Sequence, residues 1–570
     1  MLRRLAPFLE WLPELRKPGV LRADLIAGVT VATILVPQSM AYARLAGLPA
    51  VYGLYAAFLP PVVAAFWGSS RHLATGPVAM ASLISAATIQ PLAAQGSEAF
   101  ISLSILLALM VGAIRLAMGL LRLGGLVSFL SAPVVVGFTN AAALIIATSQ
   151  LHHVFGVTPV RGEYHFQTVL SVLERAATGL DWHALAMAAL AGLILVVLRY
   201  RHAKVLVAVA ATTCIAWVTG YSGEVVGQIP RGLPAFGLPH LDLTAASAMA
   251  TGALTLTLVG LMEAMSIAKT IATQSKQHID VNQELVGQGM SNLVGGLFGS
   301  YAVSGSFSRS AVNFTTGAAT GLSSAVTSVV VMLTLLFLTP LFYHLPQATL
   351  AMVIILAVMS LFKITPVRLA WRVSRGDAIV AVATFAVTLL AAPRLYLGVA
   401  IGIGLSLAQY LRRTMRPHVA YLARSPAGTL VDADANGLQL DQRIALIRFD
   451  GRLYFGAAGY FEDKVQEAVA RLPQLRYVII DAGGINQLDA TGEQTVRRVV
   501  DDLRRIDVDI YFTRSKAAFR RGLERTGTID RIGRDHFYAW NQHALEHLWG
   551  QMEPSYRDRC PLNVATPRAV

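Results

Sequence analysis

The sequence predicts a polytopic α-helical membrane protein that ends in a smaller α/β domain. Three observations predict this: hydrophobic residues make up 55% of the 570-residue chain, charged residues only 14%, and the mean hydropathy is +0.55. Soluble domains carry about 25% charged residues. The charge is also uneven, because residues 1–416 hold 26 Lys and Arg with 13 Asp and Glu, whereas residues 417–570 hold 21 and 20. We therefore expect a transmembrane domain over 1–416 and a separate domain over 417–570.

Apolar runs recur throughout the first of these regions. A helix that spans the bilayer needs about 20 mostly apolar residues. Three segments are shorter and rich in Gly, Ser or Pro, and they lie at 75–90, 287–299 and 305–317. Counting these three as short or broken helices gives fourteen segments. The other eleven lie at 22–43, 52–68, 99–121, 125–151, 182–199, 203–220, 246–273, 322–341, 346–362, 377–392 and 395–411.

Basic residues gather at alternate helix ends, which predicts the orientation of the chain. Cytoplasmic connections of membrane proteins are enriched in Lys and Arg, so we place both termini in the cytoplasm and the protein in the cytoplasmic (inner) membrane. The net charge of +14 needs no nucleic-acid partner on this interpretation. The opposite connections hold only Arg161, Arg231 and Arg394. The cytoplasmic set comprises Arg3, Arg4, Arg16, Lys17, Arg22, Arg115, Arg122, Arg199, Arg201, Lys204, Lys276, Lys363, Arg368, Arg372, Arg375, Arg412, Arg413 and Arg416.

Two of the short segments open alike, one with Ala74-Thr75-Gly76-Pro77-Val78-Ala79 and the other with Val303-Ser304-Gly305-Ser306-Phe307-Ser308. Each follows a stretch that reads as extended and precedes a half-helix. Paired interruptions in the two halves of a transporter indicate a binding site near the membrane midplane. The N-terminus of a half-helix offers free N–H groups and partial positive charge, which suits an anion. The alternative is that both segments are glycine-dependent packing contacts between helices.

Two charged residues stand out within the apolar segments. Glu263 lies inside an apolar helix, where a carboxylate is expensive and indicates function by default. Its alternative is a structural hydrogen bond to a neighbouring helix. Arg309 lies about one turn into the second half-helix and could pair with an anion. Its alternatives are snorkelling to the membrane surface, or a fixed structural pairing with Glu263.

Several function classes are excluded. No Gly-x-x-x-x-Gly-Lys-Ser/Thr motif occurs, so ATP hydrolysis by a P-loop is excluded and the energy for transport must come from a gradient. The two cysteines, Cys214 and Cys560, suggest neither a disulfide framework nor a metal site. We expect no cofactor, no metal and no enzymatic activity.

The C-terminal region reads as alternating strands and helices. Strands are predicted at Ile444–Phe449, Tyr477–Asp481 and Val508–Thr513, with helices at Tyr460–Ala470 and Thr491–Arg505. Such alternation gives a sheet covered by helices. At the junction before the second helix, Asp489 is placed to cap it and Gly492 permits a close approach.

With these residues in view, the chain resembles the SulP family of anion permeases that carry a C-terminal STAS domain, over nearly its whole length. The residues that carry the resemblance are Pro37-Gln38-Ser39-Met40-Ala41-Tyr42-Ala43, Leu45-Ala46-Gly47-Leu48-Pro49, Tyr52-Gly53-Leu54-Tyr55, Ala74-Thr75-Gly76-Pro77-Val78-Ala79, Glu263-Ala264, Lys269-Thr270 and Gly305-Ser306-Phe307-Ser308-Arg309-Ser310-Ala311-Val312-Asn313.

The resemblance implies fourteen segments arranged as seven plus seven inverted repeats, with a substrate-carrying core domain, a gate domain and a homodimer. In that family the anion lies between the two half-helix N-termini, and the first helix closes the cavity. Glu263 matches the acid of members that resemble proton-coupled sulfate symporters. The matching substrate-binding positions are Gln38, Tyr42, Thr75, Gly76, Val78, Ala79, Ser304, Gly305, Ser306, Phe307, Ser308 and Arg309.

Simple electrostatics agrees with this implication. Sulfate stays doubly charged at physiological pH, so a co-transported proton must reside on the protein, and Glu263 is the one acid expected deep in a helix. A bound anion favours the protonated carboxyl, while Arg309 favours the ionised form in the empty site. By reciprocity, protonation tightens anion binding. We therefore expect import of sulfate or a related inorganic oxyanion, coupled to protons by alternating access.

Three other functions stay open at this point. The first is proton- or sodium-coupled transport of another anion, such as bicarbonate or a C4-dicarboxylate, because N–H groups and one Arg recognise charge more than shape. The second is a membrane-anchored regulator whose STAS domain recruits a cytoplasmic partner while transport is vestigial. The third is an uncoupled anion channel. The intact half-helix motifs, Glu263 and Arg309 argue against the regulator.

Overall fold

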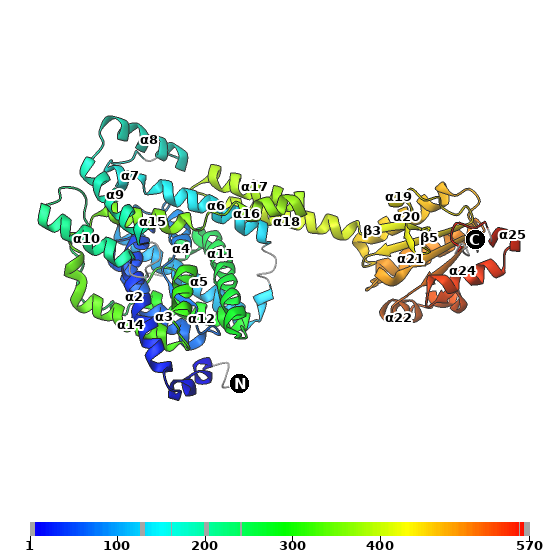
Figure 1. Ribbon diagram of the computed structural model, residues 1–570, viewed down its shortest axis with the longest axis horizontal. Helices are drawn as coiled ribbons and strands as arrows, with labels where there is room; N and C mark the ends of the chain where they lie inside the picture. The colour runs from blue at the N-terminus through cyan, green and yellow to red at the C-terminus, as the bar shows by residue number, and fades with distance from the viewer. Residues whose placement is uncertain are drawn as a thin grey trace. The chain divides into compact units, whose positions relative to one another are not determined.

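The computed structural model describes residues 6–125, 131–160, 162–198, 204–239, 242–557 and 559–563. The chain divides into two compact units, Met1–Ser406 and Leu407–Val570 (Figure 1). The division falls inside a helix, α18 (Tyr396–Met415), ahead of the change in composition at Pro417. Of the basic residues used to predict orientation, Arg3, Arg4, Arg161, Arg199 and Arg201 lie outside the described residues.

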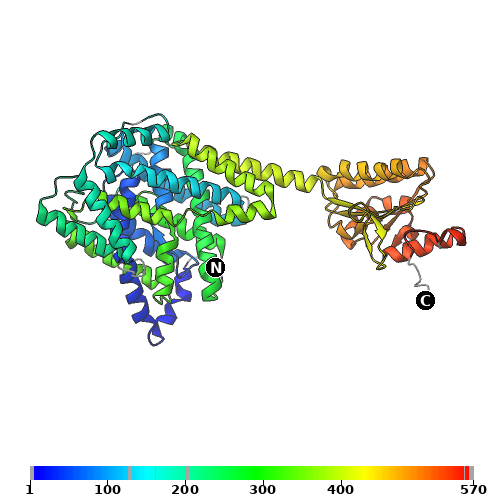
Figure 2. The same ribbon diagram turned by 45° about the horizontal axis from the view of Figure 1, so that its top comes forward.

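The first unit is built from helices in two halves that have the same element order (Figures 1 and 2). In each half, two long helices precede a short strand that leads into a short helix, and further helical segments follow. The first half comprises α2 (Val20–Leu45), α3 (Val51–Trp67), β1 (Ala74–Gly76), α4 (Ala79–Ile89), α5 (Glu98–Leu120), α6 (Ala132–Ser149), α7 (Leu151–Phe155), α8 (His165–Thr178), α9 (Trp182–Val197) and α10 (Lys204–Thr219).

The second half repeats this order and then continues into the C-terminal unit. After α14 the helix continues as a π-turn and a 3-10 turn through Phe342. The second half comprises α11 (Leu243–Ser275), α12 (Val281–Leu297), β2 (Ser304–Ser306), α13 (Phe307–Thr315), α14 (Leu322–Leu333), α15 (Gln347–Met359), α16 (Thr365–Val373), α17 (Arg375–Ala391) and α18.

The lengths and compositions of these helices fit a protein that crosses a membrane many times. Within the described residues, five helices are long and apolar enough to span a bilayer: Val20–Leu45, Glu98–Leu120, Ala132–Phe155, Leu243–Ser275 and Leu322–Phe342. The bent pair α8 and α9, which meet at 113°, makes a sixth if it is one span. Shorter apolar helices are α3, α4, α10 and α15.

The structure differs from the sequence prediction in two helices. The segment expected as short and broken at 287–299 belongs to the continuous helix α12, which begins earlier because Asp280 caps it by accepting from the N–H groups of Asn282 and Gln283. The segment expected at 125–151 is described as a helix from Ala132, and residues 126–130 lie outside the described residues.

Arg115 is a further correction. We used it as a marker of a cytoplasmic connection, but it lies inside α5 and is fully buried. Its guanidinium donates hydrogen bonds to the backbone carbonyl of Val303, just before β2, and to that of Leu256 in α11. Arg115 therefore lies within the apolar helix and does not mark its end.

The helices of the first half approach one another closely through small residues. An added Cβ at Gly53 of α3 would lie 1.9 Å from the carbonyl oxygen of Ser39 in α2. A side chain there is impossible without moving one helix backbone, so the glycine sets the separation of α2 and α3. These two helices share a hydrophobic core with α4, and they also contact β1 and α13.

The C-terminal unit is an α/β domain with a six-stranded sheet in the order β4-β3-β5-β6-β7-β8. Strands β5 to β8 are parallel, and β3 is antiparallel to both β4 and β5. The strands are β3 (His418–Arg424), β4 (Leu430–Asp432), β5 (Ile444–Asp450), β6 (Tyr477–Asp481), β7 (Asp509–Thr513) and β8 (Phe537–Tyr538).

Helices cover both faces of this sheet (Figure 2). α20 (Phe455–Arg471), α21 (Ala490–Arg505) and α22 (Ala517–Arg525) pack on one face, and α24 (Asn541–Gly550) packs on the other. Short helices α19 (Ala433–Asn436), α23 (Thr528–Ile532) and α25 (Pro554–Arg557) complete the domain. The three predicted strands and both predicted helices are present. Asp489 caps α21 as predicted, accepting from the N–H of Gly492 at 2.7 Å.

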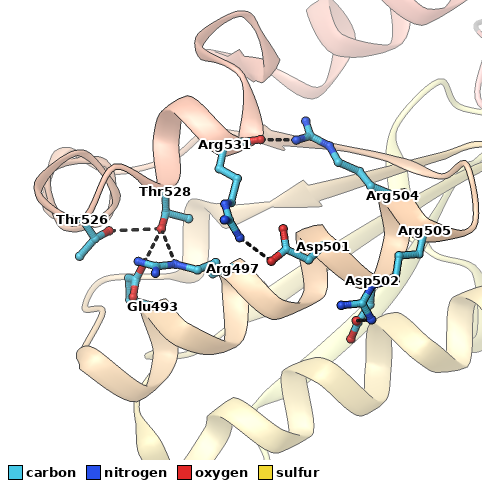
Figure 3. Close-up of polar contacts among 9 residues, drawn as sticks. All are labelled: Glu493, Arg497, Asp501, Asp502, Arg504, Arg505, Thr526, Thr528 and Arg531. Atoms are coloured by element: carbon cyan, nitrogen blue, oxygen red, sulfur yellow. Dashed lines mark hydrogen bonds and ion pairs between the residues drawn. The ribbon is translucent and has the colours of Figure 1, made fainter.

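A polar network ties α21 to α23 (Figure 3). Glu493 is nearly buried and accepts hydrogen bonds from Thr528 and from Arg497, the latter at 2.9 Å. Arg504 donates to the carbonyls of Arg531 and Ile532 at the end of α23. Burial alone raises the pKa of Glu493, but these hydrogen bonds and the charge of Arg497 outweigh burial and hold the pKa below its usual value.

Candidate functional site

The two predicted interruptions pair with each other in the middle of the first unit. β1 and β2 form a two-stranded antiparallel ribbon with Ala74 opposite Ser306, Thr75 opposite Gly305 and Gly76 opposite Ser304. All of these residues are buried. Each strand leads directly into a short helix, so the ribbon fixes the positions of both helix N-termini. Close packing of the glycines and a place in the ribbon therefore occur together.

Gly76 occupies a backbone conformation that favours glycine, with φ at +155°. An added Cβ would also lie 3.4 Å from Nη2 of Arg309. Gly305 allows a different close approach, because a Cβ there would lie 3.1 Å from the Cβ of Ala264 in α11. The ribbon is thus held against the helix that carries the neighbouring Glu263.

Neither short helix is capped by a side chain. Val78 precedes α4 and Ser306 precedes α13, both in extended conformations, and neither side chain accepts from the first turn. Val78 and Ala79 are almost fully buried. The first N–H groups of an uncapped helix have no partner within the helix, and they carry partial positive charge. The structure therefore presents two positive helix ends, one after each strand.

Arg309 joins the two short helices. It belongs to the first turn of α13, and its Nη2 donates a 2.8 Å hydrogen bond to the carbonyl of Pro77, just before α4. The side chain is fully buried, and its Nε and Nη1 have no protein partner. Complete burial rules out the snorkelling alternative, in which the guanidinium would reach a membrane surface.

Glu263 faces this region from α11. Its Oε2 atom is buried and has no hydrogen-bond partner, and its carboxyl interacts electrostatically with Arg309. Among the described residues the two groups form no ion pair within 4.0 Å. The phenol of Tyr42 in α2 also interacts with both charges. The described residues therefore show neither a direct ion pair of Glu263 with Arg309 nor a hydrogen bond at Oε2, and the two charges interact at longer range.

Glu263, which is half-buried, is not the only acid within these helices, which corrects the sequence expectation. Asp24 in α2 is fully buried and accepts from the N–H groups of Ala319 and Thr320 and from the Thr320 hydroxyl at 2.6 Å. Glu284 in α12 accepts from the N–H groups of Ser69 and Ser70, both at 2.9 Å. Both acids are saturated by hydrogen bonds and tie helices to loops. The unpartnered oxygen distinguishes Glu263 from them.

Two hydroxyls predicted to bind substrate also hold the ribbon in place. Thr75 Oγ1 accepts from Nε2 of Gln288 at 2.7 Å, and Ser304 Oγ donates to the carbonyl of Gly260 at 3.0 Å. Gln288 and Gly260 belong to α12 and α11, so each strand is fixed by a different helix of the second half. Ser304 Oγ thus uses its proton on a backbone carbonyl, whereas Thr75 Oγ1 only accepts and keeps its own O–H available as a donor.

The remaining predicted residues divide by exposure. Gln38 and Tyr42 are each 6% exposed, and Gln38 Oε1 has no partner. Phe307 and Ser308 at the start of α13 are exposed, and Lys363 Nζ lies 5.8 Å from the centre of the Phe307 ring. Of these residues, Tyr42 interacts electrostatically with Arg309, while Phe307 and Ser308 are exposed at the start of α13.

Sequence reasoning missed residues that support the ribbon. Asn292 of α12 binds both backbone groups of Val303, accepting from its N–H at 2.9 Å and donating to its carbonyl at 3.1 Å. Tyr301 and Ser82 share a hydrogen bond of 3.1 Å. Arg115 donates to the same Val303 carbonyl. Only Arg115 gave a signal in the sequence, as a charge inside an apolar run.

A small cavity of about 10 Å³ borders Arg309 on the side of α2, between Leu35, Thr75 and Thr327. A water molecule needs about 10–15 Å³ of such space, so this cavity is too small for an oxyanion. An anion on this side of Arg309 requires the surrounding side chains to move.

The fold and this arrangement define a polytopic membrane protein whose centre carries fixed positive charge, which is the class of anion transporters. Comparison with family models agrees. The model of the sulfate permease family matches residues 21–384, and that of the STAS domain matches residues 438–542. The chain belongs to the sulfate permease family, whose members are transporters rather than enzymes, and it carries a C-terminal STAS domain.

Relatives and solved structures extend this agreement. Sulfate transporter 4.1, chloroplastic, of Arabidopsis thaliana is 34% identical over 95% of this chain and 82% of its own length. The murine Solute Carrier 26 family member A9 anion transporter, solved in an inward-facing state, matches with a TM-score of 0.86 at 24% identity over 96% of this chain and 94% of that one. The transmembrane domain of the cyanobacterial bicarbonate transporter BicA matches with a TM-score of 0.59 at 24% identity, over 68% of this chain and 98% of that one. The predicted fold class is confirmed by these matches.

Proposed function

We propose that this protein imports sulfate, or a closely related inorganic oxyanion, together with protons by alternating access. The observation that carries the proposal is the fixed positive centre formed by Arg309 and the two uncapped helix ends, beside the unpartnered carboxyl of Glu263. The names of the plant relatives as sulfate transporters support the choice of anion.

In this proposal the anion binds between the N-termini of α4 and α13. The N–H groups of the first turns and the free Nε and Nη1 of Arg309 donate to it. Gln38 and Tyr42 of α2 close the site, and the two glycines of the ribbon let the backbone approach. Thr75 and Ser304 also fix the strands, because their hydroxyls are bonded to protein.

Glu263 supplies the proton coupling. A sulfate dianion near Arg309 offsets the positive charge that favours the ionised carboxyl, so binding of the anion favours uptake of a proton by Glu263. Linkage requires that the proton then strengthens anion binding by the same factor. Because sulfate itself does not take up the proton, an inward proton gradient drives sulfate inward. The unpartnered Oε2 suits this role, since proton uptake there breaks no hydrogen bond at that oxygen.

The proposal includes the setting in which transport occurs. We place the transport domain over residues 1–416 in the cytoplasmic (inner) membrane, with both termini and the STAS domain of residues 417–570 in the cytoplasm. The protein works as a homodimer, and the STAS domain is open to a cytoplasmic partner. The lipid bilayer is the surrounding solvent of the helical unit, as its apolar helices require.

The test is uptake of labelled sulfate into liposomes that contain the purified protein, with and without an inward proton gradient. We expect gradient-dependent uptake that selenate inhibits, and Glu263→Gln should abolish accumulation while leaving sulfate binding measurable. Glu174→Gln is the control, because Glu174 is an exposed acid on α8. Accumulation by Glu263→Gln at the wild-type level would contradict the role of Glu263. If labelled sulfate is not taken up but another labelled anion, such as bicarbonate or fumarate, is taken up in an inhibitable way, the substrate is replaced and the mechanism is kept.

A further inference from the structure

Arg115 is a fully buried cation that no carboxylate neutralises. It lies on α5, and its side chain is 0% exposed. Nη1 donates to the carbonyl of Val303 at 2.9 Å and Nη2 to the carbonyl of Leu256 at 3.1 Å, while Nε has no partner. Within the described part of the chain, no acidic side chain acts on it. Burying an unpaired ion costs several kcal/mol in proteins, so its presence calls for a compensating role.

A purely structural role does not explain this charge, because its two acceptors do not depend on it. The Val303 carbonyl also accepts from Nδ2 of Asn292 at 3.1 Å. The Leu256 carbonyl lies inside the continuous helix α11, where the residue one turn later supplies an N–H. The guanidinium therefore depends on these two hydrogen bonds, whereas each carbonyl has another donor. A neutral side chain in its place would leave both carbonyls with a donor.

The position of Arg115 links it to the ribbon. A Cβ added at Gly260 would lie 2.4 Å from Arg115 Nη2 and 3.0 Å from Ser304 Oγ. The guanidinium and the first residue of β2 therefore both lie close to Gly260 of α11. Ser304 begins the strand that leads into α13. Because a chain spans at most about 3.5 Å per residue, the charge lies no more than roughly 12 Å from the N-terminus of α13.

We infer that Arg115 is a second fixed positive charge of the anion site, which strengthens anion binding through its electric field without touching the anion. This inference rests on the proposed anion transport. The low-dielectric surroundings transmit the field, because both Arg115 and the ribbon are buried and water does not screen them. Together with Arg309, the site then matches the two charges of sulfate.

A field acts on each anion in proportion to its charge, which gives a quantitative signature. At roughly 12 Å and an effective dielectric constant of about 20, loss of one positive charge weakens the binding of a monoanion about tenfold and of a dianion about a hundredfold. A displaced or loosened ribbon has no reason to follow this rule. The ratio of the two losses therefore separates an electrostatic role from a structural one.

The experiment measures the dissociation constant for sulfate, and the inhibition constant of bicarbonate as a competing monoanion, on the purified full-length protein. Arg115→Met should weaken sulfate about a hundredfold and bicarbonate about tenfold, and Arg115→Lys should stay within a few-fold of wild type. Asn292→Ser is the matched control, because it loosens the same strand without changing the charge. Asn292→Ser should change the dissociation constant of sulfate and the inhibition constant of bicarbonate by similar small factors. Arg115→Gln replaces the Met variant if that variant does not fold.

Wild-type sulfate affinity in Arg115→Met would overturn the inference, as would equal losses in the Lys and Met variants. If bicarbonate does not compete on the wild type, the sulfate comparison of Lys with Met decides. If the wild-type protein binds no anion at all, the proposed function fails and the inference fails with it. If the wild type binds sulfate and the neutral variant binds it equally well, only the role of Arg115 is refuted.

Discussion

Replacing Arg309 by Met should separate the stability of this protein from its function. In the wild type the guanidinium is fully buried, and only one hydrogen bond from it is present, from Nη2 to the carbonyl of Pro77 at 2.8 Å. Nε and Nη1 have no protein partner. Met keeps most of the volume of the side chain while it removes the charge. The unliganded protein should therefore become more stable, whereas on the proposed function a bound anion loses its principal charged donor.

The magnitude follows from these contacts. A hydrogen bond from a charged group contributes about 1.5–3 kcal/mol, while the effective penalty for burying an ion is several kcal/mol. Their difference predicts that Arg309→Met stabilises the unliganded protein by about 1–3 kcal/mol. Sulfate at a hundred times its dissociation constant should stabilise the wild type by about 2.7 kcal/mol. The same concentration should not stabilise the variant.

The assay is thermal unfolding of the purified protein in detergent, with and without sulfate. We expect Arg309→Met to raise the apparent melting temperature without sulfate and to abolish the shift that sulfate causes. Arg231→Met is the control, because Arg231 is exposed in a connection and its replacement should leave the sulfate shift unchanged. A variant that is less stable than wild type, or that keeps the full sulfate shift, would refute the reasoning.

Two further predictions concern packing and pH. Gly305→Ala places a Cβ 3.1 Å from the Cβ of Ala264, so it should lower stability by about 1–3 kcal/mol and slow sulfate uptake. Gly404→Ala is the control, because a Cβ there meets nothing within 4 Å and should change neither property. Equal effects of the two substitutions would contradict the close approach at Gly305. The lowered pKa of Glu493 means that its contribution to stability is present above about pH 4.3 and is lost as pH falls through the folded-state value. The protection of backbone amides in α21 and α23 against hydrogen exchange, corrected for the intrinsic exchange rate at each pH, should therefore fall in acid. Glu493→Gln should remove that dependence, and an unchanged acid response in the variant would exclude Glu493 as the cause.

Much of the C-terminal domain could be predicted from its sequence. Tyr477–Asp481 is a strand with the expected bounds, and Asp489 caps α21 as its position indicated. These features depend on local patterns, because a buried parallel strand reads as an apolar run and a cap needs only its own first turn. Strands β3, β4 and β8 at the outer parts of the sheet were not predicted, since their role depends on neighbours that lie elsewhere in the chain.

In the membrane unit, the sequence located the two interruptions but not their partnership. Gly76 and Gly305 marked non-helical backbone correctly, and the register that places Thr75 opposite Gly305 came only from the structure. Arg115 was misjudged because a charge within an apolar run fits a helix end as well as a buried site. The carbonyls that hold it belong to a distant strand and helix.

The sequence by itself determined the class of protein, the series of apolar segments and the α/β nature of the C-terminal domain, because hydrophobicity, charge and periodicity are properties of contiguous residues. Only the tertiary structure decided which buried charges are available for chemistry. The carboxylate of Asp24 accepts hydrogen bonds from a loop almost three hundred residues away, whereas Glu263 keeps an unpartnered oxygen. The physical reason is that hydrogen bonds form between atoms that folding brings together, and no local pattern records that meeting.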